Sequence, residues 1–104
     1  MLQETYNMIN NRLFDGELPD CTIYWLDEPE LDFWPNSQID GCYVREAGEH
    51  FIAIYIGLST ARYFNTMVHE CIHVWQAHTG RKVNHGKSFK YWCQKAYEEF
   101  YESV

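Results

Sequence analysis

The sequence has no CxxC pair and no long apolar run. Its four cysteines, Cys21, Cys42, Cys71 and Cys93, stand singly, which argues against a zinc ribbon or a dithiol redox motif. No stretch approaches the roughly 18 apolar residues of a membrane-spanning helix, and the first residues lack the features of a signal peptide. We therefore expect a cytoplasmic protein with reduced thiols and no membrane association. Cys71 and Cys93 fall in helical patterns, where buried structural thiols are expected.

Basic residues are scarce and unevenly placed. The chain has 8 basic against 15 acidic residues, and this net charge opposes a general affinity for nucleic acid. Residues 1–58 carry two basic and eleven acidic residues, whereas residues 59–104 carry six basic and four acidic ones. The candidate nucleic-acid contacts in the second part are Arg81, Lys82, Lys87 and Lys90. A solvated helix face is the alternative interpretation of this cluster.

Glycine and proline are also few, at six and three residues. No linker-like or low-complexity stretch divides the 104 residues, so a single domain over residues 1–104 is expected. Hydrophobic periodicity and turn residues predict an α+β fold with a mainly antiparallel three-stranded sheet. The predicted order is a helix over 2–13, strands over 21–26, 41–46 and 50–57, a helix that begins after Ser59 or Asn65 and ends at Gly80, and a helix over about 88–102.

The motif HECIH, residues 69–73, lies in the middle of the second predicted helix. His69 and His73 are one helical turn apart, so their imidazoles can bind one metal ion. Glu70 projects about 100° further round the helix, where its carboxylate can reach a water molecule rather than the metal. Two neutral imidazoles that hold zinc and a glutamate that takes a proton from water form the HExxH site of zinc hydrolases. The alternative is a pair of histidines hydrogen-bonded in the core.

A hydrolytic zinc site needs a third protein ligand and an open position for water. His78 is nine residues beyond His69, which places it on the opposite side of the same helix. His50 begins a strand beside a turn and is expected to face solvent. His85 follows the turn TGRKVN, which can bring the chain back over the face of His69 and His73, so His85 is the predicted third ligand. One zinc ion per chain is expected, with manganese or cobalt as alternatives.

The run HECIHVWQAHTGRKVNHGKSFKYWC resembles the active-site segment of the SprT-like (SprT/Spartan) metalloprotease family. The family pattern is HExxH, a glycine, and HG with an aromatic residue three positions after that glycine. It falls here on His69, Glu70, His73, Gly80, His85, Gly86 and Phe89. Upstream, NRLFDGELPDCTIYW and GCYVREAGEHFIAIYI are similar to the family's opening helix, turn, first strand and hairpin. The resemblance implies a minimal zincin-like domain with zinc on His69, His73 and His85 and with Glu70 as general base.

The function that we expect is zinc-dependent hydrolysis of peptide bonds in a protein or peptide substrate. An extended substrate is expected to pair with the sheet beside residues 50–57. Family members with added DNA-binding parts cleave proteins crosslinked to DNA. This sequence has no CxxC pair and no basic tail, so weak DNA association would need the basic cluster or another chain. The alternatives are a non-catalytic adaptor stabilised by zinc and a DNA-associated accessory module. The substrate and the oligomeric state are left open.

Overall fold

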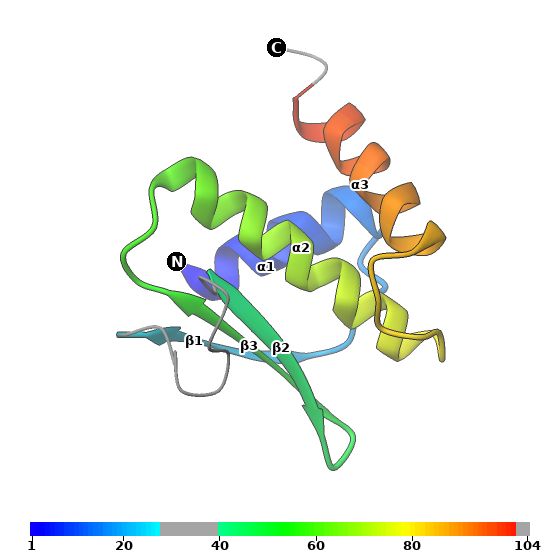
Figure 1. Ribbon diagram of the computed structural model, residues 1–104, viewed down its shortest axis with the longest axis horizontal. Coiled ribbons are helices and arrows are strands. Elements are labelled where there is room, and N and C mark those ends of the chain that lie inside the picture. Colours follow the sequence, from blue (N-terminus) through cyan, green and yellow to red (C-terminus); the bar gives the residue numbers. More distant parts are fainter. Residues whose placement is uncertain (28–39, 102–104) are drawn as a thin grey trace.

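A computed structural model describes residues 1–27 and 40–101 of the chain. Its elements, in order, are α1 (Leu2–Leu13), β1 (Cys21–Leu26), β2 (Gly41–Glu46), β3 (Glu49–Tyr55), α2 (Thr60–His78) and α3 (Lys87–Phe100). The predicted α+β class and element order are confirmed, and the three helices lie on one side of the sheet (Figure 1). Within the described residues, no helix is both long enough and apolar enough to cross a membrane.

The ends of α2 are set by local sequence. Ser59 is the N-cap, and its Oγ accepts a hydrogen bond from the backbone N of Arg62 at 3.3 Å. This confirms Ser59, rather than Asn65, as the start signal. The helix ends before Gly80, which has a φ of 77°, and the backbone N of Arg81 donates to the carbonyl oxygen of Gln76 at 2.8 Å. A left-handed residue of this kind is the usual way to stop a helix and turn the chain.

The sheet is mixed, with the order β1-β3-β2. The hairpin of β2 and β3 is antiparallel, whereas β1 pairs parallel to β3. The mainly antiparallel sheet that the sequence predicted is therefore antiparallel in only one of its two pairings. Ala47 and Gly48 both have positive φ, at 51° and 81°, which is the geometry of a two-residue hairpin turn. Residue alternation correctly predicts the strands, but it does not indicate which strand is central in the sheet.

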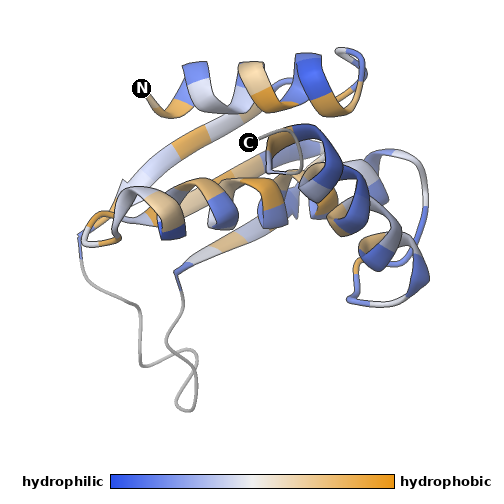
Figure 2. Ribbon diagram, turned by 90° about the horizontal axis from the view of Figure 1, so that it is seen from above, coloured by the Kyte–Doolittle hydropathy of each residue, from blue (hydrophilic) through white to orange (hydrophobic). Residues whose placement is uncertain are grey.

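The core lies between the helices and the sheet. Its fully buried apolar side chains come from every layer: Tyr6, Ile9, Ile52, Ile54, Met67, Cys71, Ile72 and Val74. Hydrophobic and hydrophilic residues form alternating bands along the helices in Figure 2, as expected where each helix has one buried side. Burial of each aliphatic side chain contributes roughly 1.5–3 kcal/mol. The core thereby fixes α2 against the sheet, and α2 carries the HExxH motif.

Some side chains on the helices are less buried than the core. Trp75 is half-buried, with its ring centroid 5.2 Å from that of Trp92. Ala61, in the first turn of α2, is exposed. Cys93 is exposed too, whereas Cys71 is fully buried as predicted. The prediction that Cys93 is buried was therefore wrong, because periodicity alone does not reveal which part of a helix its neighbours cover.

Strand β2 runs alongside α2. A Cβ atom at Gly41 would lie 2.7 Å from the Cγ2 atom of Thr66 and 2.9 Å from the carbonyl oxygen of Ala53. At the other end of the strand, Arg45 donates a hydrogen bond to the carbonyl oxygen of Ala77 at 3.4 Å. Thr66 and Ala77 precede and follow the HExxH motif, so β2 flanks the whole segment that contains it.

Gly41→Ala is expected to lower the free energy of unfolding by about 1–3 kcal/mol, because the added methyl group has to push α2 and β3 apart. Urea denaturation of both proteins tests this. Adding Thr66→Ala should recover part of the loss, since it removes the nearer of the two obstacles. An unchanged unfolding midpoint in Gly41→Ala would show that β2 and α2 are less closely packed than described.

Candidate metal centre

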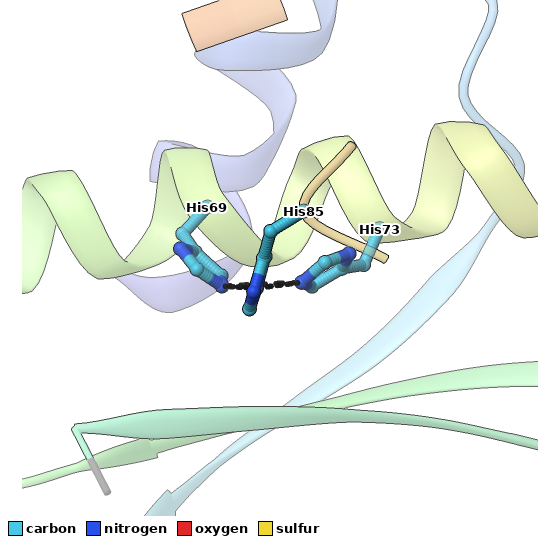
Figure 3. A group of neighbouring side chains, drawn as sticks. All are labelled: His69, His73 and His85. Carbon is cyan, nitrogen blue, oxygen red and sulfur yellow. Dashed lines mark hydrogen bonds between the residues drawn. The ribbon is translucent and has the colours of Figure 1, made fainter. Parts of the chain in front are cut away.

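Three histidine side chains meet at one point beside α2 (Figure 3). His69 and His73 project from the helix, and His85 comes from the loop before α3. The Nε2 atoms lie 3.1 Å apart for His69 and His73, 3.3 Å for His73 and His85, and 3.2 Å for His69 and His85. The structure therefore brings together the three residues that the sequence proposed as ligands. Among the described residues, no other group of three histidine, cysteine or acidic side chains is close enough to hold a metal ion.

The spacing of the nitrogens matches that of zinc ligands. Zinc binds imidazole nitrogen at about 2.0–2.1 Å in a tetrahedral arrangement, which places two ligand nitrogens about 3.3 Å apart. The observed separations of 3.1–3.3 Å agree with that value. Three imidazoles make a site for a borderline metal such as zinc rather than for magnesium or calcium, which prefer oxygen ligands. The residues present thus fit a zinc ion.

One of the rings is held in the tautomer that a metal ligand needs. Nδ1 of His73 lies 2.9 Å from Oε1 of Gln76. This oxygen also lies 3.3 Å from the backbone N of Asn84, a donor, so it is the acceptor in both contacts. The proton of His73 is consequently on Nδ1, and the lone pair of Nε2 points at the other two rings. A histidine that donates through its second nitrogen is typical of metal ligands.

Phe89 closes one side of the cluster. Its ring centroid lies 4.7 Å from that of His69, 5.2 Å from that of His73 and 4.7 Å from that of His85. Phe89 is half-buried against the core and lies two residues after the start of α3. An apolar ring against all three imidazoles restricts their rotation and excludes water from that side. The aromatic residue of the family pattern thus has a direct structural use.

The electrostatics of the cluster favour neutral imidazoles. Burial, followed by the proximity of His73 and His85, lowers the pKa of His69 from 6.5 to about 4. Burial is also the main cause that lowers the pKa of His73, although the hydrogen bond to Gln76 acts in the opposite direction. His69 and His73 are therefore deprotonated at neutral pH. A deprotonated imidazole is the form that binds a metal ion.

Glu70 is a buried carboxyl beside the cluster. The residue is 4% exposed, and its Oε1 atom lies 3.9 Å from Nε2 of His69. Its Oε2 atom is buried and has no hydrogen-bond partner in the described part of the chain. Burial raises the pKa of Glu70 from 4.5 to about 7. A carboxyl with a pKa near neutrality is suited to accept and return a proton.

The raised pKa of Glu70 predicts a pH-dependent difference between the metal-free protein and metal-free Glu70→Gln. The native state holds the Glu70 proton up to about pH 7, whereas the unfolded state loses it near pH 4.5, so wild type loses stability as the pH rises through this window. Glu70→Gln lacks this loss. Between pH 4.5 and pH 7, the free energy of unfolding of Glu70→Gln should therefore rise by about 3 kcal/mol relative to that of wild type. Urea denaturation with a chelator present measures this difference. Glu49→Gln changes an exposed glutamate, and its unfolding free energy should depend on pH as that of wild type does. If Glu70→Gln shows the same pH dependence as wild type, the carboxyl of Glu70 is not buried as described.

The other two histidines lie outside the cluster. His78 is exposed at the end of α2, as predicted. The prediction for His50 was wrong in part: it lies outside the cluster, but it is 5% exposed instead of facing solvent. Its Nδ1 is 2.6 Å from the hydroxyl of Tyr43, and its ring centroid is 6.2 Å from that of His78. β3 is the central strand, so its second residue, His50, pairs with a residue of β1 on one side and of β2 on the other.

The four basic candidates for nucleic-acid contact are exposed: Arg81, Lys82, Lys87 and Lys90. They occupy the loop after α2 and the first turn of α3. The guanidinium carbon of Arg81 lies 4.5 Å from the centre of the Trp75 ring, so this side chain packs on the protein. The structure places these residues on the surface of the segment that presents His85.

Gln76 is the residue that sequence reasoning missed. It is fully buried and contacts a histidine of the cluster. The available signal was its position three residues after His73, which places the two side chains on the same face of the helix. A polar residue among the buried positions of α2 needs a partner, and His73 supplies one.

The comparisons with known proteins agree with the geometry. The model of the SprT-like family matches residues 36–103. This range includes the histidine cluster, Glu70 and the loop that carries His85. No curated protein gives a significant match to the chain. The family match covers well over half of the sequence and supports a metalloprotease-like domain with a histidine cluster suited to a metal. The chain therefore belongs to the SprT-like family.

Proposed function

We propose that this protein is a zinc-dependent endopeptidase that holds one zinc ion on His69, His73 and His85. The observation that carries the proposal is the buried carboxyl of Glu70, which lies 3.9 Å from a nitrogen of the cluster and has one oxygen without a partner among the described residues. Burial without a partner is costly for a carboxyl, and a purely structural metal site has no need of it. Zinc bound here would lower the pKa of a water molecule and polarise a substrate carbonyl.

Glu70 is the proton carrier in the proposed reaction. Its carboxylate takes a proton from the water molecule whose oxygen bonds to the carbonyl carbon of the peptide. The C–N bond then breaks, and Glu70 returns the proton to the leaving nitrogen. The second proton of the water molecule also passes to this nitrogen, so that the products are a carboxylate and an ammonium group. Burial raises the pKa of Glu70 to about 7 in the metal-free protein, and a zinc ion on the three histidines would lower it toward the carboxylate form that accepts the first proton.

An extended substrate cannot pair with the sheet at the position predicted from the sequence. β3 is hydrogen-bonded on both sides, to β1 and to β2, so it offers no free edge beside residues 50–57. β2 is the edge strand that flanks α2, from Gly41 beside Thr66 to Arg45 beside Ala77. An extended peptide added along the outer edge of β2 would run past the HExxH segment, with its backbone bound by strand addition.

The alternative of a zinc-stabilised adaptor makes a different use of the same site. In an adaptor the three histidines would hold the fold together, and Glu70→Gln would leave function unchanged. The buried carboxyl favours the enzyme, because replacement by a neutral residue would stabilise a purely structural site.

A DNA-bound or DNA-crosslinked protein is the finer proposal for the substrate. The exposed basic residues near His85 are what supports this proposal. A few exposed basic side chains would bind DNA phosphates only weakly and in a salt-sensitive way.

Metal analysis and a cleavage assay test the proposed function together. The purified protein should contain about one zinc ion per chain. It should cleave a protein substrate in a reaction that requires Glu70, with a free protein and a DNA-crosslinked protein compared side by side. Equal cleavage of both would remove the DNA-specific part of the proposal. Zinc at one per chain with no Glu70-dependent cleavage of either substrate would favour the adaptor.

A further inference from the structure

We infer that Gln76 is a positioning residue that couples the two parts of the metal site, the HExxH helix and the loop that carries His85. This inference rests on the zinc site proposed above. Gln76 is fully buried, and its side-chain amide contacts both ligand-bearing segments. It acts through His73 and through the neighbour of His85, and it does not touch the substrate or the reacting atoms.

The contacts of Gln76 to the loop resemble those between two strands. Its Nε2 donates to the carbonyl oxygen of Asn84 at 3.0 Å, and its Oε1 accepts from the backbone N of the same residue at 3.3 Å. Both backbone groups of Asn84 are therefore bound by one side chain. Asn84 immediately precedes His85, so the amide fixes the chain at the point from which the third imidazole projects.

A third contact extends this arrangement to α3. Nε2 of Gln76 also donates to Oγ of Ser88 at 3.0 Å, in the first turn of α3. The side chain of Asn84 separately accepts a hydrogen bond from the backbone N of Gly86 at 2.9 Å, which shapes the turn into the helix. Each polar atom of the Gln76 amide is thus used, and the partners belong to α2, the loop and α3.

The orientation of the amide is determined by its backbone partners. A backbone N–H can only donate and a carbonyl oxygen can only accept, so the two bonds to Asn84 place oxygen and nitrogen without ambiguity. The oxygen thereby faces Nδ1 of His73 and keeps the proton on that nitrogen. A residue that bound only the loop, or only His73, would leave one ligand free to rotate away from the other two.

The test measures zinc affinity by competition with a chromophoric chelator, and the stability of each metal-free protein by urea denaturation. Gln76→Met, which has a similar volume and no amide, should bind zinc about 10–100-fold more weakly, the usual loss when a residue that orients a metal ligand is removed. Gln76→Glu restores an acceptor for His73 and for the backbone N of Asn84, so it should bind zinc more tightly than Gln76→Met. Ser88→Ala, which removes one contact to α3 only, should stay within about threefold of wild type.

A merely structural role predicts the reverse order for the two main variants. A buried carboxylate that faces the carbonyl oxygen of Asn84 would disturb the fold more than methionine does, so Gln76→Glu would then be the weaker zinc binder. That order, or a zinc affinity of Gln76→Met equal to wild type, overturns the inference. If Gln76→Met does not fold, Gln76→Asn takes its place, since it keeps a polar amide but withdraws it from His73. Absence of zinc from the wild-type protein would instead overturn the proposed function itself, and the inference with it.

Discussion

Glu70→Gln is expected to lower the rate of peptide hydrolysis by about 10³-fold while the protein keeps its zinc. General acid–base catalysis by a placed side chain contributes about 10²–10⁴-fold. Among the described residues, Glu70 is a buried carboxyl beside the cluster with one oxygen that has no hydrogen-bond partner. Glutamine has nearly the same shape but cannot accept and return the proton. The measurement is kcat/KM on a protein or peptide substrate, with zinc content determined on the same sample.

The matched control for this prediction is Glu49→Gln, which changes an exposed glutamate at the start of β3. It should hydrolyse the substrate at the wild-type rate. If Glu70→Gln keeps wild-type activity with zinc bound, then Glu70 is not the general base. If it loses its zinc, the carboxyl has a structural role at the site, and the loss of activity would say nothing about proton transfer.

His85→Ala is expected to weaken zinc binding by about 10²–10³-fold and to abolish hydrolysis. Zinc sites with four protein ligands have apparent binding free energies of about 10–16 kcal/mol, so each ligand contributes roughly 3–4 kcal/mol, which corresponds to that factor. His85 is exposed and lies outside the helices. The metal-free variant should therefore unfold at nearly the same urea concentration as metal-free wild type.

His78→Ala is the control for this second prediction. His78 also follows the HExxH motif, but its exposed side chain lies outside the cluster, so zinc affinity should stay within about threefold of wild type. Equal zinc affinity in wild type and His85→Ala would remove His85 from the ligand set. A result in which His78→Ala loses zinc and His85→Ala does not would mean that the loop adopts another arrangement when metal is bound.

Local pattern was sufficient to predict most of the secondary structure and the shared helix side of His69 and His73. His69 and His73 were predicted to share one side of a helix because helical geometry repeats every 3.6 residues, and the same rule excluded His78. Ser59 and Gly80 mark the ends of α2 through short-range contacts that any helix with these residues would make. Predictions of this kind succeed because the interactions that determine them lie within a few residues of one another.

Features that depend on distant contacts were wrong or missed. The central place of β3, the burial of His50 and the exposure of Cys93 follow from which elements pack together. Strand order cannot be read from alternation, because an edge strand and a central strand can show the same pattern. The expected pairing of a substrate beside residues 50–57 failed for this reason, and our proposal of β2 in its place rests on the pairing of β3 on both sides.

The sequence by itself determined that a helix would present two histidines and a glutamate with the spacing of a zinc hydrolase. It could only suggest that His85 joins them, since a turn of suitable length permits the approach without imposing it. The tertiary structure decided that approach, through the buried amide of Gln76 that binds both His73 and the backbone of Asn84. It also raised the pKa of Glu70 to about 7, because desolvation of a carboxyl depends on the packing around it and not on its neighbours in the chain.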